Sequence, residues 1–488
     1  MAVVGAVLAL DVGTSSCRAS LYDTTGRPIR GRSARIGYAP QVTADGGAHF
    51  DANALFEQVC SAIDQVLDNK TPPLLGVATD TFWHSLLGLD ARGEAQTPVY
   101  PWLDARSRDD IAGLRKRLDE HAVHARTGCM LHWSYWPAKL AWLRRTRPDV
   151  FSRVQRWVSF GEFLIERLTG ATGVSVSMAS GTGLMNAHTC TWDDELLRAV
   201  GVQPNQLGRI TRLRETSAAT RITLTRWPKL KGVPWLLAVG DGACSNLGAG
   251  CTTPDNFALM IGTSGAERVV SSPAGPFEIP RGTWCYRVDE HRIVLGGALN
   301  DGGSLFDWLR ATLRLRSLQT AEAEVSALEP DRHGLTVLPF WGGERSPGWA
   351  DDARGAIVGL RLHTTPLDIL RASMEAVALR FGELDRALLQ AMPRAGDLVG
   401  TGGALLHSPA WMQMLADVLG RPVSASAEAE ASSRGAALLA LETLGLLDAP
   451  LESLRPAVRR RFEPISAHTE RYRAAAERQR RLYDALIS

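Results

Sequence analysis

A Gly-Thr-Ser turn between two apolar runs occurs twice in this chain, at residues 13–15 and again at residues 262–264. A glycine followed by hydroxyl side chains in a tight turn presents backbone N–H and side-chain O–H donors together, which suits a phosphate group. Two copies of the turn in one chain predict two related halves that hold one polyphosphate from opposite sides.

The residue two places before each turn differs in a way that bears on metal binding. Asp11 precedes the first turn, whereas Met260 stands at the matching place before the second. A carboxylate at the end of a strand, beside a phosphate-binding turn, can hold Mg²⁺ directly or through water. Only the first half offers this ligand, which is what an ATP–Mg²⁺ enzyme with one metal requires.

Two further glycine-rich turns follow strand-like runs. Residues 400–404, Gly-Thr-Gly-Gly-Ala, carry no bulky side chain, so an adenine ring or an α-phosphate can approach their backbone closely. Asp241 stands between two glycines after the apolar run 234–239, where its carboxylate can take a proton from an attacking hydroxyl. Each motif by itself is also typical of an ordinary turn.

A cluster of His, Trp, Asp and Arg follows the apolar run 74–78. It comprises residues 83–85, Trp-His-Ser, and residues 101–106, Pro-Trp-Leu-Asp-Ala-Arg. Such side chains recognise polyols by hydrogen bonds and ring stacking, and Arg106 can bind a carboxylate through two parallel hydrogen bonds. Considered singly, His84 is more typical of a buried core histidine, and any one of the fourteen tryptophans is unremarkable.

A framework of mixed α/β type must position these motifs. Apolar runs predict strands at 7–12, 17–22, 74–78, 234–239 and 397–403, the last one running into its glycine turn. Helical spacing predicts helices at 53–68, 107–120, 137–147, 160–168, 366–391, 408–419 and 470–488. The pattern is that of open sheets covered by helices. We place the domain boundary near residue 250, which gives domains 1–250 and 251–488.

Composition excludes several classes of protein. A chain of 488 residues is too long for one ordinary core, so two domains are expected. Its 54 basic and 52 acidic residues give a formal charge of +2, which argues against a nucleic-acid binder or a membrane-surface protein. Seven cysteines without paired spacing predict reduced thiols in a cytosolic protein rather than disulfides or a zinc site.

Several sequence signatures are absent. No run of about 18 apolar residues is present, so no transmembrane helix is expected. The apolar start of the chain is typical of a buried strand and not of a signal peptide. The sequence G-x-x-x-x-G-K-[ST] of P-loop proteins is missing, as is the signature set of protein kinases.

Taken together and in this order, the motifs resemble those of the FGGY family of carbohydrate kinases. The resemblance covers almost the whole chain, through Asp11–Ser16, Trp83–Asp90, Pro101–Arg106, Gly240–Gly250, Ile261–Gly265, Gly296–Trp308, Gly343–Leu360 and Thr401–Val423. Within the family the chain is most similar to gluconokinases, on residues 178–184, 262–268, 296–303 and 343–349. Xylulokinases are similar at many of the same places.

The resemblance implies a two-domain actin-like ATPase fold of the ribonuclease H type, with mixed sheets flanked by helices and a cleft between the domains. By position it implies that Asp241 is the catalytic base and that Asp11 lies near Mg²⁺. It implies an ATP site formed by Thr14, Ser15, Gly262, Thr263, Gly302, Gly303, Gly402, Gly403, Ala404 and Gln413. It implies a sugar site lined by Trp83, His84, Trp102, Asp104 and Arg106.

The chain departs from the family pattern at two places. Phe82 and Trp83 stand where the family usually has Gln-Met, or a small residue and Met, before the sugar-site histidine. A bulky tryptophan there is expected to shrink or reshape the pocket. Thr401 stands where the adenosine motif usually begins with a third glycine, which is expected to matter little.

The resemblance implies transfer of the ATP γ-phosphoryl group to a sugar or sugar-acid hydroxyl, with D-gluconate giving 6-phosphogluconate as the first expectation. A xylulokinase or another pentulose or polyol kinase is the alternative. A non-metabolic ATPase switch of the same fold is a third hypothesis, from another class. The family also implies a cytoplasmic protein with a small-molecule substrate, no nucleic-acid or membrane partner, and homodimers as a common form.

Overall fold

The apolar run near the start of the chain forms the central strand of a mixed sheet. The computed structural model describes residues 5–315, 318–393 and 396–487. Residues 6–10 of this strand have no exposed surface, because strands lie on both of its edges and helices on both faces. The sheet has the order β13-β6-β1-β2-β3, with β1 (Ala6–Val12), β2 (Ser16–Tyr22), β3 (Pro28–Gly37), β6 (Leu74–Thr81) and β13 (Val239–Gly240).

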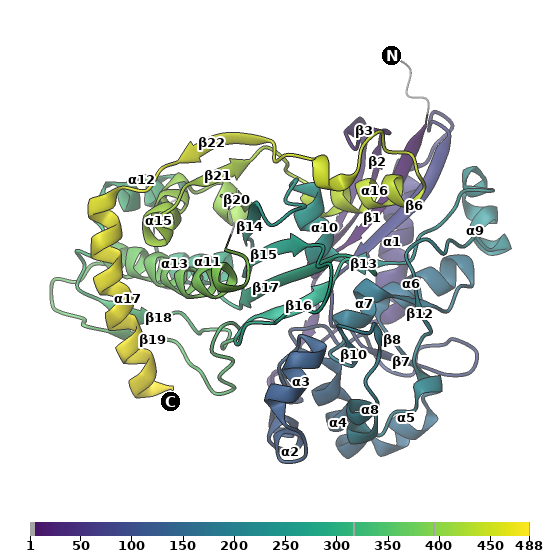
Figure 1. Ribbon diagram of the computed structural model, residues 1–488, viewed down its shortest axis with the longest axis horizontal. Helices are drawn as coiled ribbons and strands as arrows, with labels where there is room; N and C mark the ends of the chain where they lie inside the picture. Colours follow the sequence, from purple (N-terminus) through teal and green to yellow (C-terminus); the bar gives the residue numbers. More distant parts are fainter. Residues whose placement is uncertain (1–4, 316–317, 394–395, 488) are drawn as a thin grey trace.

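A second sheet repeats this arrangement, as Figure 1 shows. Its order is β16-β17-β15-β14-β20-β21-β22, with β14 (Asn256–Ile261), β15 (Gly265–Ser271), β16 (Trp284–Arg287), β17 (Ile293–Leu299), β20 (Asp397–Thr401), β21 (Val423–Ser426) and β22 (Val458–Phe462). β14 pairs antiparallel with β15 and parallel with β20, as β1 does with β2 and β6. The prediction of two related α/β halves with an actin-like fold is confirmed.

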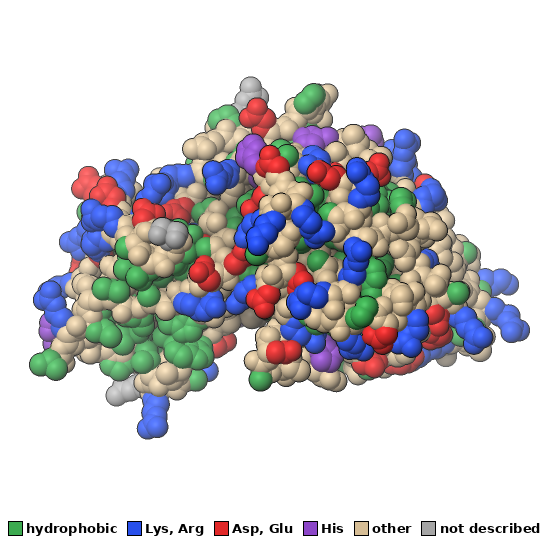
Figure 2. All heavy atoms as spheres, turned by 90° about the horizontal axis from the view of Figure 1, so that it is seen from below, with side chains coloured by type: hydrophobic (Ala, Val, Ile, Leu, Met, Phe, Trp, Pro, Cys, Tyr) green, Lys and Arg blue, Asp and Glu red, His purple; other side chains and the backbone are tan. Residues whose placement is uncertain are grey.

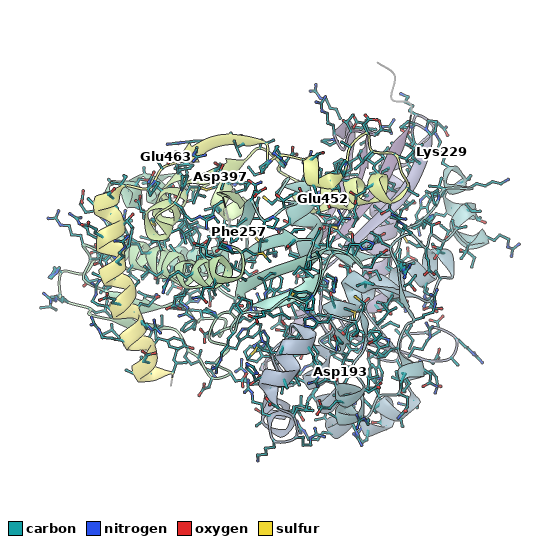
Figure 3. The ribbon with its side chains drawn as sticks, viewed as in Figure 1. Asp193, Lys229, Phe257, Asp397, Glu452 and Glu463 are labelled. Carbon is teal, nitrogen blue, oxygen red and sulfur yellow. The ribbon has the colours of Figure 1, made fainter. Side chains whose placement is uncertain are left out.

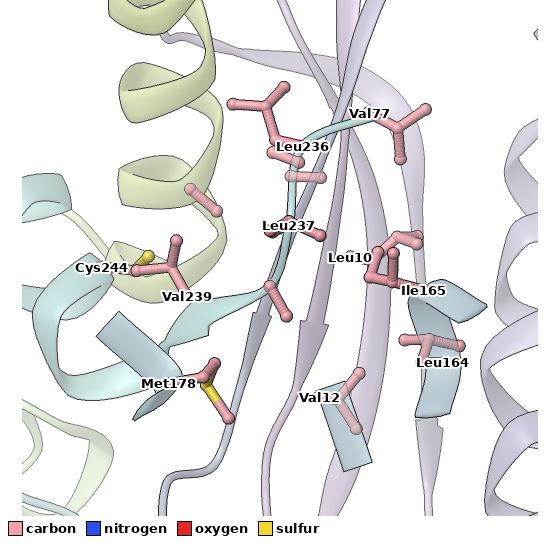
Figure 4. Close-up of a cluster of buried hydrophobic side chains, with 14 of the residues drawn as sticks. Leu10, Val12, Val77, Leu164, Ile165, Met178, Leu236, Leu237, Val239 and Cys244 are labelled. Atoms are coloured by element: carbon pink, nitrogen blue, oxygen red, sulfur yellow. The ribbon is translucent and has the colours of Figure 1, made fainter. Parts of the chain in front are cut away.

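Helices cover both faces of the first sheet. α1 (Ala52–Val66) begins after Asp51, whose side chain accepts a backbone N–H of the first turn at 2.8 Å, a common way to start a helix. Its apolar side packs on β2 and β3, and α6 (Phe160–Thr169) packs on β6. Figure 4 shows Leu164 of α6 on one side of the strands and Cys244 on the other.

Two helices lie between the sheets, α10 (Asp241–Gly248) and α16 (Ala431–Thr443) (Figure 1). They cross at backbone contact. A Cβ on Gly248 would lie 1.8 Å from a carbonyl oxygen of α16, and one on Gly435 would lie 1.8 Å from a carbonyl oxygen of α10. Only glycine permits so close an approach, so the two helices are fixed against each other without side chains between them.

The helix α16 belongs to the core of the first domain although it comes from the C-terminal part of the chain. It packs on β1 and β6, and the hydroxyls of Tyr22 and Ser433 are 2.7 Å apart. The predicted boundary near residue 250 thus separates the two sheets, but the predicted domain 251–488 contains a helix of the first core. Figure 3 shows Glu452 in the segment after α16, where it pairs with Arg292 at 3.5 Å.

The remaining elements complete the two domains. The second sheet is accompanied by α11 (Gly303–Thr312), α12 (Leu318–Ala327), α13 (Pro366–Ala391), α14 (Gly403–Leu406), α15 (Pro409–Leu419) and α17 (Ser466–Leu486). The first domain adds α2 (Ile111–Arg115), α3 (Glu120–Thr127), α4 (Trp136–Thr146), α5 (Pro148–Arg153), α7 (Val176–Ser180), α8 (Asp194–Val200) and α9 (Arg221–Arg226). Short two-stranded pairings are formed by β4 (Gln41–Val42), β5 (Ala48–His49), β7 (Leu87–Leu89), β8 (Arg156–Val158), β9 (Val174–Ser175), β10 (Met185–Asn186), β11 (Thr191–Trp192), β12 (Ile210–Thr211), β18 (Thr336–Leu338) and β19 (Ala356–Val358).

Two predicted elements differ from the structure. The helix predicted at 107–120 is only a 3₁₀ turn and the short α2, because Asp119 starts a new helix by accepting two N–H groups of α3. The strand predicted at 234–239 pairs regularly only at its end, in β13, while Trp235 makes single bridges to Val77 and Ser217.

The surface carries charges of both signs. Figure 2 shows Lys and Arg interspersed with Asp and Glu over the face that it presents, with apolar side chains gathered toward its left side. In the part of the chain that the structure describes, no helix combines the length and the apolar character needed to cross a membrane.

Candidate active site

A cavity of about 830 Å³ lies between the two domains, and both domains contribute side chains to its wall. The first domain contributes Thr14, Ser15, Trp83, His84, Trp102 and Asp241, among others. The second domain contributes Thr263, Arg268, Tyr286, Asp301 and Arg345, among others. A site that lies between two domains can close around its ligands and exclude water.

The two Gly-Thr-Ser turns face each other across this cavity as the β1–β2 and β14–β15 connections. The N–H of Gly13 donates to the carbonyl of Ser16, and that of Gly262 to the carbonyl of Ser264, both at 2.9 Å. No acceptor among the described residues takes the backbone N–H of Thr14, Ser15, Thr263 or Ser264. These donors fit the oxygens of a polyphosphate.

The region around Gly302 and Gly303 holds the second turn in place. The N–H of Gly303 donates to the carbonyl of Gly262 at 2.8 Å. A Cβ on Gly302 would lie 2.8 Å from the carbonyl oxygen of Ser264, and one on Gly303 would lie 2.5 Å from that of Gly262. Glycine is therefore required here by the approach of α11 to the turn.

A neighbouring cavity of about 400 Å³ continues from Gly262 and Thr263 along the second domain. Gly403 and Ala404 line it together with Trp411, and a Cβ on Gly403 would meet no atom within 4 Å. A flat, partly apolar group such as adenosine fits this space. The residues present thus fit ATP, with its phosphates on the two turns.

Three residues predicted for the ATP site line neither cavity, namely Gly302, Gly402 and Gln413. Gly402 has φ +86° and packs against the backbone at the start of the second turn, since a Cβ on it would lie 2.5 Å from the carbonyl oxygen of Ile261. The side-chain amide of Gln413 donates to Asp417 at 2.9 Å and to the carbonyl of Glu463 at 2.8 Å. Gln413 lines neither cavity, so the structure does not bring it to the nucleotide site.

Asp241 is the first residue of α10, and its carboxylate borders the large cavity. One of its oxygens accepts the N–H of Gly242 at 2.7 Å. Burial raises the pKa of Asp241 to about 6, while the charge of Arg268 partly offsets this rise. A carboxylate with a pKa near this value can accept a proton from a hydroxyl and remain ionised at neutral pH.

Trp83 packs directly beside Asp241 and is held in one position. Its indole N–H donates to the carbonyl of Ser177 at 3.0 Å, and its ring lies 4.7 Å from that of Tyr286. A Cβ on Gly240 would lie 1.8 Å from this indole. The bulky residue that departs from the family pattern is thus accommodated by glycine, and it forms a fixed apolar wall beside the carboxylate.

His84 presents a neutral imidazole to the cavity. Its Nδ1 lies 2.5 Å from the carbonyl oxygen of Gly181, which requires a proton on Nδ1 and leaves Nε2 as an acceptor. Burial lowers the pKa of His84 to about 3, so the ring stays uncharged at neutral pH. A neutral acceptor of this kind suits a sugar hydroxyl.

Trp102 connects the sugar side of the cavity to the first turn. Its indole N–H donates to the hydroxyl oxygen of Thr14 at 3.1 Å, and the guanidinium of Arg345 lies 4.7 Å from its ring centre. Trp102, predicted for the sugar site, and Thr14, predicted for the ATP site, thus line one cavity.

Asp104 and Arg106 bind each other instead of lining the cavity. The carboxylate of Asp104 is buried and accepts hydrogen bonds from the guanidinium of Arg106 and from the N–H of Ala48. Arg106 also packs over the ring of Trp142 at 4.7 Å. The expectation that Arg106 takes a substrate carboxylate does not fit this geometry, because its guanidinium is already paired and lies outside the cavity wall.

The residues near the end of β1 fit a magnesium ion. Asp11 lies behind the first turn, where it accepts a bond from Arg18 at 3.2 Å. It is paired in the sheet with Asp80, a fully buried residue whose two carboxylate oxygens have no hydrogen-bond partner among the described residues. Burial and the charge of Asp11 raise the pKa of Asp80 well above its usual range. The raised pKa of Asp80 favours its protonated form, so the carboxylate of Asp11 is the hard oxygen donor here that suits Mg²⁺.

Several cavity residues have no role assigned from the sequence, among them Arg268, Tyr286, Asp301 and Arg345, which carry polar or charged groups. Arg268 stands two places after Ala266 in β15, so both side chains face the cavity. That alternation is the signal that could have revealed Arg268. Tyr286 lies in the edge strand β16, and Asp301 and Arg345 lie in loops. No local sequence pattern indicates that these segments reach the cavity.

Comparisons with known proteins agree with this arrangement. Models of the FGGY family of carbohydrate kinases match residues 6–248 as the N-terminal domain and residues 259–443 as the C-terminal domain. The gluconokinase of Bacillus subtilis (strain 168) is 27% identical over 459 residues, covering 91% of this chain and 88% of the relative. The xylulose kinase of Streptomyces rubiginosus is 31% identical over 443 residues, covering 88% of this chain and 86% of the relative.

A solved structure of a gluconate kinase from Lactobacillus acidophilus superposes with a TM-score of 0.90 at 27% identity, and the match covers 99% of this chain and 98% of that one. Both domains are thus matched along nearly the whole length. The chain belongs to the FGGY family of carbohydrate kinases and is a phosphotransferase that acts on a sugar.

Proposed function

We propose that this enzyme transfers the γ-phosphoryl group of ATP to a terminal hydroxyl of an open-chain sugar acid, with D-gluconate as substrate and 6-phosphogluconate as product. The observation that carries the proposal is the position of Asp241. Its carboxylate borders the same cavity as both phosphate turns and the neutral imidazole of His84. A base, a phosphate site and a hydroxyl acceptor are thereby within one enclosed space.

In the proposed reaction Asp241 accepts the proton of the attacking hydroxyl. General-base catalysis of this kind contributes about 10²–10⁴ in rate, or roughly 3–5 kcal/mol of the barrier. His84 accepts a hydrogen bond from a second hydroxyl and so fixes the sugar chain. The N–H groups of the two turns bind the phosphate oxygens, and Trp83 excludes water beside the base. Phosphoryl transfer depends mainly on such positioning.

A magnesium ion bound with ATP would neutralise charge on the phosphates. We propose Asp11 as the residue that holds it, directly or through water. The pairing of Asp11 with Arg18 favours the second arrangement, because one carboxylate oxygen is already occupied. Since ATP and sugar acids of this kind meet in the cytoplasm, we propose that the enzyme acts there.

The choice of D-gluconate rests on the gluconokinase and gluconate kinase relatives. Xylulose kinases are similarly related, one at 31% identity, so phosphorylation of a ketopentose is the second candidate. Both reactions use the same base and the same ATP site, and they differ only in what the far end of the substrate presents to the protein.

The test is ATP consumption by the purified enzyme in the presence of D-gluconate, other aldonates, D-xylulose, L-ribulose, glycerol and erythritol. Strong stimulation by D-gluconate, with 6-phosphogluconate identified as product, supports the proposal. Stimulation by a ketose alone overturns the sugar-acid assignment in favour of the second candidate. The oligomeric state, for which a homodimer stays a prediction, can be measured by light scattering on the same sample.

A further inference from the structure

Two arginines in the wall of the large cavity are buried without a carboxylate partner. Arg268 and Arg345 are each only 9% exposed, and neither takes part in an ion pair with any described residue. Nε and Nη1 of Arg268 and Nε of Arg345 are buried without any acceptor. The hydrogen bond from Arg345 to the carbonyl of Leu299 is long, at 3.4 Å.

Buried arginines elsewhere in the described residues bind carboxylates or, for Arg287, the carbonyl of Ala187 at 2.6 Å. Arg371 binds Glu375 at 2.7 Å, and Arg292 binds Asp289 at 2.5 Å. A buried cation without an anion is strongly unfavourable, because burial removes hydration that nothing replaces. The two unpaired arginines in the cavity wall therefore point to an anionic ligand.

The acids nearest to these arginines are engaged elsewhere. Asp301 influences Arg345, but its carboxylate accepts the N–H of Gly342 at 2.9 Å. Asp241 influences Arg268, and its carboxylate accepts the N–H of Gly242. Neither acid neutralises its arginine by direct contact, so both guanidinium groups remain available to a bound molecule.

The two arginines occupy different positions relative to the base. The guanidinium of Arg268 is beside Asp241, since a Cβ on Gly242 would lie 3.0 Å from its Nε. The guanidinium of Arg345 lies instead over the ring of Trp102, and its charge acts on His84. Arg268 is thus at the reacting end, and Arg345 is on the sugar side of the cavity.

We propose that Arg345 selects sugar acids by binding their carboxylate, an inference that rests on the proposed function. A terminal hydroxyl placed at Asp241 leaves the opposite end of an open-chain substrate toward the sugar side. The planar guanidinium binds a carboxylate through two parallel hydrogen bonds, and stacking on Trp102 fixes its plane. This is the role that the sequence suggests for Arg106, which is paired with Asp104.

A third arginine of the cavity serves as a matched control. Arg108 lies over the ring of Trp133 at 4.4 Å, much as Arg345 lies over Trp102. Its Nε is likewise buried without an acceptor, but three acidic groups act on it, those of Asp351, Asp109 and Asp352, whereas Asp301 is the acid that acts on Arg345. Its replacement removes one stacked positive charge from the same cavity without touching the proposed carboxylate site.

The experiment compares kcat/KM of the wild type, Arg345→Gln and Arg108→Gln for D-gluconate, D-xylulose and D-glucitol, the neutral polyol with the same carbon chain as gluconate. We expect Arg345→Gln to lose on the order of 10²-fold on D-gluconate, mostly through KM, and to change little on the neutral substrates. Arg345→Lys keeps the positive charge but loses the planar guanidinium with its two parallel N–H donors. It should retain part of the preference for D-gluconate over the neutral substrates.

Three outcomes would overturn the inference. An equal loss on the acid and on both neutral substrates, with a raised KM for ATP, would mean that Arg345 serves the γ-phosphate. An equal loss of gluconate preference in Arg108→Gln would mean a general charge effect. Activity of the wild type on a ketose but on no aldonate would overturn the proposed function together with the inference. This result needs only the wild-type enzyme, so it is distinguished from a failure of the inference alone. If Arg345→Gln does not fold, two other measurements decide the question. The first is the substrate preference of Arg345→Lys. The second is the thermal unfolding midpoint of the wild type, which D-gluconate should raise more than D-glucitol does.

Discussion

A Cβ atom on Gly240 would lie 1.8 Å from Cε2 of the Trp83 indole. The ring occupies the space that a side chain at position 240 would need, directly before Asp241, the proposed base. Gly181 and Gly242 are in similarly close contact with the same ring, since a Cβ on the first would lie 2.3 Å from the indole and one on the second 2.7 Å. Trp83 is therefore matched by glycine on three sides, and the positions around it accommodate its size.

This fit predicts energetic coupling between Trp83 and Gly240. Gly240→Ala should destabilise the protein and lower kcat/KM, because the indole must move away from the added methyl group. In the double variant Trp83→Ala, Gly240→Ala the methyl has room, so we expect a coupling free energy of about 0.5–3 kcal/mol. Denaturant unfolding and kinetics of the four proteins measure it. Additive effects of the two changes would show that the contact is unimportant.

Replacement of Asp241 by Asn should remove the base without altering the fold. We expect kcat to fall by about 10²–10⁴-fold while the affinity for ATP, measured by titration calorimetry, stays within a factor of a few. Asp301→Asn is the matched control, because Asp301 lines the same cavity and burial likewise raises its pKa to about 6. A near-normal kcat for Asp241→Asn, or an equal loss for Asp301→Asn, would contradict the assignment.

The raised pKa of Asp241 predicts the acid side of the pH profile. The base acts in its ionised form, so kcat/KM should be constant above its pKa of about 6 and fall about tenfold per unit below it. Arg268→Gln removes the charge that partly offsets burial, and the fall should then begin at higher pH. The measurement is kcat/KM of both proteins from about two pH units below this pKa to about two above it. An unchanged pH profile of kcat/KM in Arg268→Gln would rule out the proposed effect of Arg268 on the pKa of Asp241.

The crossing of α10 and α16 predicts a large stability effect at a position far from substrate. Gly435→Ala places a methyl group 1.8 Å from a carbonyl oxygen of α10, so the helices must separate, at a cost of about 3 kcal/mol. Gly113→Ala is the control, since a Cβ there meets nothing within 4 Å and alanine favours a helix. Equal midpoints of urea unfolding for the two variants would show that the helices tolerate separation.

The phosphate turns could be predicted because each depends on a few adjacent residues. Gly262-Thr263-Ser264 lies between strands whose apolar pattern is visible in the sequence, and only Gly240 separates Asp241 from an apolar run. Arg345 could not be placed in the same way. Its position depends on a loop that folds back over Trp102, which is more than 200 residues earlier in the chain.

Arg106 and Gln413 illustrate the opposite error. Both have the side-chain chemistry for their expected roles, but each finds a partner within the protein, Asp104 for the first and Asp417 for the second. Motif spacing identifies the loop or helix that approaches a ligand, whereas the direction of each side chain is decided by competing hydrogen bonds.

The return of α16 to the first sheet has a consequence for how the protein is made. β1 is synthesised well before the helix that covers it, which lies more than 400 residues later in the chain. Until then the apolar face of the nascent sheet has no cover, a condition that favours aggregation and slow folding. A fragment ending at residue 250 would keep that face exposed, so the domain that carries Asp241 is finished only when the chain extends through α16.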